Sequence, residues 1–140
     1  MIRVENLEIV RREVRLIRPP RQEFEFTYLH GISWDKVAGE PVFGAVWPQM
    51  LGLLDGAEFI AAHHASFDEG VLRACVRSAR LPMPTLPFQC TVTLARKTWN
   101  IFPTKLPNVC RHLGIPLKHH DAASDAEACA QIVIAACRGK

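Results

Sequence analysis

The chain has 140 residues, 49% hydrophobic and 22% charged, with a formal net charge of +3. This composition excludes a disordered chain and is typical of one globular domain with a buried core. No apolar run is long enough to span a bilayer, and residues 1–5 do not resemble a signal peptide, so we predict no membrane association. The five cysteines include no Cys-x-x-Cys pair, which argues against a zinc ribbon and favours a reduced, cytoplasmic protein. The mild positive charge permits a nucleic-acid ligand.

The first part of the chain predicts a hairpin and then a helix. Residues 2–4 and 9–17 alternate apolar and polar side chains around a polar turn, which indicates an antiparallel pair of strands. Residues 24–29 form a further short extended piece. Apolar residues then recur at helical spacing over residues 43–54, and Asp55-Gly56 closes that helix.

Strands and helices alternate from residue 58 onward. The apolar run 58–62 predicts a buried strand, and Ser66 with Glu69 three residues later predicts a capping box that opens the next helix. A further strand is expected at residues 88–92, a helix at residues 94–99, and a helix of roughly two turns that ends at Leu113 before Gly114. The final helix begins near Asp121 or Ser124 and runs to about Cys137. We therefore predict a single α/β domain over residues 1–140, with a mixed sheet flanked by helices.

Two carboxylates stand at the starts of helices. Asp68 follows the buried strand, and Asp125 lies five positions after His120. Each has a structural interpretation, because acids near helix N-termini complement the dipole and Ser124 with Glu127 would form a second capping box. The functional interpretation is a ligand crevice at the sheet edge. Carboxylates suit Mg²⁺ or Mn²⁺, and a histidine can take a proton from an attacking water, which together equip a site for metal-assisted phosphodiester hydrolysis.

A zinc site is an alternative for the same region. His63 and His64 lie close to Asp68 in the sequence, and a third ligand would come from His119 or His120. This alternative predicts stoichiometric zinc in the purified protein.

The two stretches together resemble the DEDDh 3′–5′ exonucleases, a family typified by the epsilon proofreading subunit of bacterial DNA polymerase III. Residues 120–126 match the third motif of that family, His-x-Ala-x-x-Asp-Ala, completely. Residues 63–68 match the second motif, His-Asn-Ala-x-Phe-Asp, with His64 where the family usually has Asn. The resemblance extends to the turn at residues 30–32 and implies an RNase H-like fold.

The resemblance also implies roles for individual residues. Asp125 would bind the catalytic metal directly, Asp68 would support it, and His120 would be the general base. Residues near the substrate would be His30, Ile32, His64 and Phe67. The complete family site holds two Mg²⁺ or Mn²⁺ ions and acts on nucleic acid with a free 3′ end. A polymerase partner or a homo-oligomer would be compatible with it.

One family motif is missing from this sequence. The first motif, Asp-x-Glu on a central strand, does not occur before residue 30, and Glu23-Phe24-Glu25 has the spacing but follows the hairpin. We therefore expect an N-terminally incomplete exonuclease-like domain with impaired activity, because the missing pair normally bridges both metals. The alternative is a catalytically inactive nucleic-acid-binding or interaction module on the same fold. The choice between DNA and RNA stays open.

Overall fold

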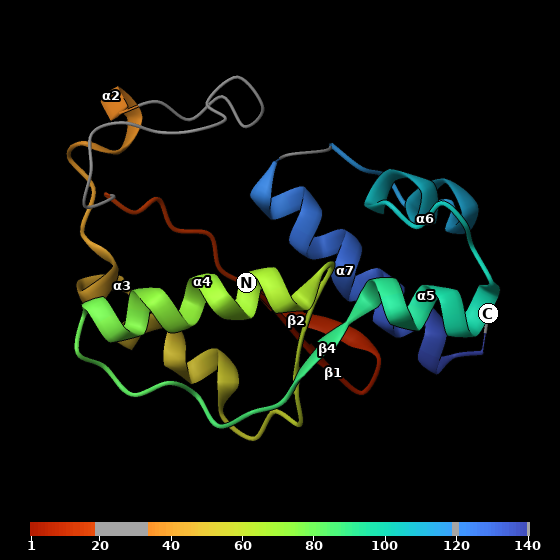
Figure 1. Cartoon of the computed structure of the whole chain (residues 1–140), viewed down its shortest axis with the longest axis horizontal. Helices are drawn as coiled ribbons and strands as arrows, with labels where there is room; N and C mark the ends of the chain where they lie inside the picture. Colours follow the sequence, from red (N-terminus) through yellow and green to blue (C-terminus); the bar gives the residue numbers. More distant parts are fainter. Residues whose placement is uncertain (19–33, 119–120, 140) are drawn as a thin grey trace.

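The computed structural model describes residues 1–18, 34–118 and 121–139, without the side chains of residues 34 and 35. Short strands and longer helices follow one another along the chain (Figure 1), as expected for an α/β protein. The elements are β1 (Ile2–Glu5), β2 (Glu8–Arg12), α2 (Trp34–Val37), α3 (Phe43–Met50), the 3₁₀ helix η1 (Leu51–Leu54), β3 (Ile60–Ala62), α4 (Ala65–Ser78), β4 (Phe88–Cys90), α5 (Thr91–Trp99), α6 (Leu106–Leu113) and α7 (Ala122–Cys137). None of the helices in these ranges is both long and apolar enough to cross a membrane. The extended piece predicted at residues 24–29 lies outside the described residues.

The described strands form two small sheets. The predicted hairpin is confirmed: β1 and β2 pair antiparallel, with Ile2 opposite Arg12. β3 and β4 pair in parallel, with Ile60 opposite Phe88. Both strand orientations of a mixed sheet are therefore present, although no strand within the described ranges joins the two pairs. β3 is half-buried rather than buried as predicted, because β4 pairs with only one of its edges.

The helices supply two hydrophobic clusters that hold the sheets in place. One cluster lies between α5, α6 and α7, where Ala95, Val109 and Ile132 are fully buried. Small residues such as Ala95 and Ala128 let these helices approach closely. The other cluster joins α3, η1 and α4. Because α7 contacts β1, β3, α5 and α6, it connects both sheets to the first cluster.

The start of α4 differs from the prediction. Ser66 was expected to cap the helix, but α4 begins at Ala65 and Ser66 lies in its first turn. His64 precedes the helix in the left-handed conformation, with φ 60° and ψ 56°, and caps it with no side-chain hydrogen bond. The Phe67 N–H donates to the His64 carbonyl at 3.0 Å. A sharp backbone turn after β3 therefore starts this helix, so a capping hydroxyl is not needed.

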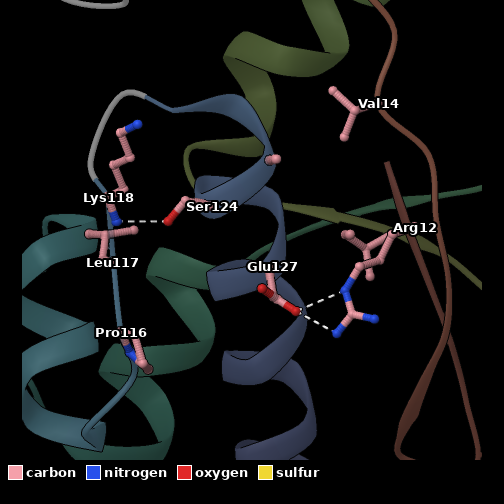
Figure 2. A pocket seen from close by; sticks show the side chains of 9 residues that line it. Arg12, Val14, Pro116, Leu117, Lys118, Ser124 and Glu127 are labelled. Carbon is pink, nitrogen blue, oxygen red and sulfur yellow. Dashed lines mark hydrogen bonds and ion pairs between the residues drawn. The ribbon is translucent and has the colours of Figure 1, made fainter.

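The start of α7 selects one of the two predicted caps. Asp121 is the cap, because its Oδ1 accepts from the Ser124 N–H at 3.0 Å. The Ser124 hydroxyl instead accepts from the Lys118 N–H at 2.7 Å, which ties the preceding loop to the helix (Figure 2). Glu127 pairs with Arg12 of β2 at 2.6 Å. The Ser124–Glu127 capping box is therefore wrong, since both side chains bind other partners.

Candidate functional site

Asp68 lies in the first turn of α4, directly after the β3–α4 turn. Its side chain is exposed, yet the surrounding protein removes enough water that desolvation raises the pKa of its carboxyl group. The nearby His64 acts in the opposite direction and lowers that pKa. The net upward shift means that the carboxylate gains stabilisation from a cation placed beside it.

Asp125 occupies the equivalent place on α7, because it also lies in the first turn of its helix. Its backbone N–H donates to the carbonyl of the capping Asp121 at 2.8 Å, which sets the residue within the helix. The side chain is half-buried, and its Oδ1 atom is shielded from solvent. The Ala-rich sequence around it lets α7 lie against its neighbours, so the carboxylate is held inside the fold rather than on its surface.

The charges of both carboxylates influence the thiol of Cys129, a half-buried residue of α7. Cys129 lies one helical turn after Asp125, and burial raises the pKa of its thiol. The backbone of His63 and the side chain of Thr91 lower that pKa, whereas the negative charges of Asp125 and Asp68 raise it. β3 is contacted by both α4 and α7, so this strand connects the two helices that carry the carboxylates. Asp68 and Asp125 are 57 positions apart in the sequence.

His63 is a structural centre of this region that the sequence did not reveal. Its Nδ1 lies 2.8 Å from the Thr91 hydroxyl, and its Nε2 lies 2.8 Å from the Thr104 carbonyl. A carbonyl can only accept, so Nε2 carries a proton and donates it. Both threonines are buried, at 1% and 4% exposure, and the imidazole therefore joins β3 to α5 and to the loop before α6.

The same contacts argue against the zinc alternative. Both ring nitrogens of His63 are engaged by protein groups, which leaves no lone pair for a metal. No group of three or more His, Cys, Asp or Glu residues that could hold a metal occurs within residues 1–18, 34–118 and 121–139. The sequence carries one signal for the structural role of His63, which is its position at the end of an apolar strand whose side chains face the core.

His64 and Phe67 are displayed on the surface beside Asp68. His64 stands where the family usually has Asn, and its left-handed backbone explains the exchange, because both residue types are enriched in that conformation. Its ring meets His63 edge-on, with 5.2 Å between the centroids. Phe67 is 72% exposed, so its ring is available to a ligand rather than committed to the core.

The remaining predicted site residues lie outside the described residues. These are His120, His30 and Ile32. His120 directly precedes the cap of α7 in the sequence, but nothing in the structure tests its role as a base. The roles assigned to these three residues therefore stay predictions.

The donor set suits a hard divalent cation in part. Mg²⁺ is commonly held by one or two carboxylates, with water and substrate phosphate completing its shell. Asp68 and Asp125 are two such carboxylates on separate, rigid helices. Within the described part of the chain no third ligand joins them. The described residues therefore offer two carboxylates as candidate ligands of a hydrated ion and do not form a complete two-ion site.

A hollow of about 510 Å³ lies on another side of the first turn of α7. Figure 2 shows it between the hairpin and the loop before α7, with the Arg12–Glu127 pair at its rim. Its lining includes Ser124 but neither Asp68 nor Asp125. The hollow is therefore separate from the paired carboxylates.

Comparison with known proteins identifies relatives of the chain. The family model RNase T, described as exonuclease, matches residues 1–133. DNA polymerase III PolC-type of Clostridium perfringens is 33% identical over 79% of this chain and 8% of its own length. The PolC-type polymerase of Thermotoga maritima is 27% identical over 95% of this chain and 10% of its own length. The 3′-5′ exonuclease DinG of Bacillus subtilis is 35% identical over 89% of this chain and 14% of its own length. The chain thus spans only a small part of these proteins.

A solved structure matches the whole fold. The chain of exonuclease X in complex with 5′ overhanging duplex DNA superposes with a TM-score of 0.79 at 26% identity. The match covers 98% of this chain and 79% of that chain. The expected DEDDh-type exonuclease fold is therefore confirmed.

Proposed function

Since the chain belongs to the exonuclease family that matches residues 1–133, we propose that it is a 3′–5′ exonuclease domain that hydrolyses phosphodiester bonds at nucleic-acid 3′ ends. The observation that carries the proposal is this family match together with the placement of Asp68 and Asp125, each in the first turn of its helix, α4 and α7.

The protein residues have distinct tasks in this proposal. Asp68 and Asp125 would hold Mg²⁺ or Mn²⁺, of which the complete family site has two ions. When bound, the metal offsets the negative charge that develops on the phosphate in the transition state. His120 accepts the proton of the attacking water. Phe67 and His64 lie beside Asp68 on the surface, where they would contact the 3′-terminal nucleotide together with His30 and Ile32.

The proposal also includes a nucleic-acid substrate and a polymerase partner. Exonuclease X is bound to duplex DNA in the matching structure, which supports a nucleic-acid substrate here. The PolC-type relatives are polymerases by name, which supports a polymerase partner. Two described carboxylates do not make a two-ion site, so we also propose that the sequence as it stands has impaired activity. The same observation favours the second candidate, an inactive nucleic-acid-binding module.

A nucleotide-release assay separates the two candidates. We would incubate 3′-labelled single-stranded DNA and RNA with Mn²⁺ and compare the chain as it stands with a version carrying an added Asp-x-Glu strand. The exonuclease proposal expects release that rises steeply in the added-strand version, because the extra carboxylates complete the metal site. The inactive-module candidate expects binding of the same substrates without release by either version.

The added-strand version also carries the controls. His120→Ala and Asp125→Asn should each abolish most of its release, whereas Asp121→Asn should not, because an asparagine also caps the helix. If the added-strand version releases no nucleotides, or if His120→Ala leaves its release unchanged, the exonuclease assignment is wrong.

A further inference from the structure

The charge of the chain is distributed very unevenly. Residues 70–120 contain eight of the 17 Lys and Arg residues and none of the 14 Asp and Glu residues. The ion pairs of the described residues lie on the hairpin and at the starts of α4 and α7. Across residues 91–117, by contrast, the structure shows four exposed cations without a carboxylate partner: Arg96, Lys97, Lys105 and Arg111. The exposed surface of residues 91–117, which include α5 and α6, therefore forms a cationic face with no carboxylate of its own.

An aromatic ring stands on this face in a fixed position. Phe102 is 63% exposed, and the Arg96 guanidinium lies over the ring at 5.1 Å from its centroid. Arg96 is itself held, because its Nε donates to the Thr104 hydroxyl at 2.9 Å. That hydroxyl is buried and donates to the Ile101 carbonyl at 2.7 Å. An exposed Phe held by such a chain of contacts loses little freedom when a ligand stacks on it.

A hollow of about 360 Å³ opens beside the ring. We call it the Phe102 surface, and its lining is Ile101, Phe102, Pro103, Asn108, Arg111 and His112. We propose that the Phe102 surface is a second nucleic-acid contact, where an unpaired base stacks on Phe102 and the adjoining phosphates meet Arg111. Single-strand binding sites combine these two features, an aromatic platform and a cationic track without acids. This inference rests on the proposed function, since it extends the substrate beyond its 3′ end.

The Phe102 surface is connected to the carboxylate site through Thr104. The Thr104 carbonyl accepts from His63 at the end of β3, and the Thr104 hydroxyl accepts from Arg96, whose guanidinium lies over the Phe102 ring. One buried residue thus contacts both regions. A strand whose 3′ end lies at Asp68 would continue over the loop at residues 100–105 onto the cationic face.

Binding is tested without metal, so that catalysis does not enter. Fluorescence anisotropy in EDTA would compare an oligothymidylate of about ten nucleotides with a dinucleotide. Phe102→Leu, which keeps an apolar side chain, should weaken binding of the longer strand about 5- to 100-fold and leave the dinucleotide unchanged. Phe102→Trp should restore it. Arg111→Gln should lower the slope of log affinity against log salt by about 0.7, the value for one single-strand phosphate. Arg11→Gln removes the same charge from the hairpin and should have little effect.

Three further outcomes would overturn the proposal. The first is an abasic strand of equal length that binds as tightly as the oligothymidylate, since then no base stacks. The second is polyglutamate that displaces the strand at equal charge, which would make the face a site for acidic peptides. The third is absence of measurable binding at low salt. Failure of the added-strand version to release nucleotides with Mn²⁺, by contrast, refutes the proposed function alone and leaves the binding result standing.

Discussion

Replacing His63 by alanine tests the arrangement that joins β3 to α5 and to the loop before α6. The imidazole bonds the Thr91 hydroxyl and the Thr104 carbonyl at 2.8 Å each, and both threonines are almost fully buried. A net hydrogen bond contributes about 1 kcal/mol, and a buried polar group left without a partner costs about 1–3 kcal/mol. We therefore expect His63→Ala to lower the free energy of unfolding by about 2–4 kcal/mol. With a urea m-value of about 2 kcal/mol per M, the unfolding midpoint should fall by about 1–2 M.

Two companion variants make the result specific. His64→Asn alters the adjacent exposed histidine, and Asn also tolerates the left-handed backbone, so its effect should stay within about 0.5 kcal/mol. Thr91→Val removes only the hydroxyl partner of His63. His63→Ala and Thr91→Val delete the same hydrogen bond. The variant that combines these two changes should therefore lose less stability than the sum of the two single variants. A midpoint that shifts by less than about 0.3 M in His63→Ala, or fully additive losses, would refute the bridging role.

Other consequences of the structure can be checked separately. Ile132→Ala should cost about 2–5 kcal/mol in urea unfolding, because Ile132 is fully buried between α7 and its neighbours; a loss below about 1 kcal/mol would contradict that packing. Asp121→Ala should cost about 1 kcal/mol in the same assay and Glu127→Ala clearly less, because Asp121 is the cap; equal losses would restore the capping box. Burial acts to raise the pKa of the Cys90 thiol, but backbone N–H groups at the starts of α4 and α5 outweigh burial, so that the pKa is lowered. Burial raises the pKa of the Cys110 thiol to about 11. Since only the thiolate reacts, iodoacetamide should label Cys90 at lower pH than Cys110, as measured by peptide mapping; the reverse order would contradict the assigned environments.

Local patterns in the sequence predicted most of the elements. The alternation in residues 2–4 and 9–17 predicted the hairpin, although its second strand ends at Arg12 and not at Ile17. Helical spacing located α3, α6 and α7 to within a few residues. The errors lie at helix starts. The predicted Ser66 capping box does not form, because the backbone turns at His64 and α4 begins before Ser66. The predicted Ser124–Glu127 box does not form, because Glu127 binds Arg12 of the hairpin and the Ser124 hydroxyl binds the Lys118 N–H in the preceding loop.

The sequence by itself determined the family, because two motifs of ordered residue types carry that information without coordinates. It also determined that the first carboxylate pair does not occur before residue 30. Only the tertiary structure decided that the helices of Asp68 and Asp125 both contact β3, that His63 bonds two buried threonines, and that the Arg96 guanidinium lies over the ring of the exposed Phe102. The physical reason is that hydrogen bonds and charges act over a few ångströms of space. The sequence order of these residues does not specify those distances until the helices and sheets pack.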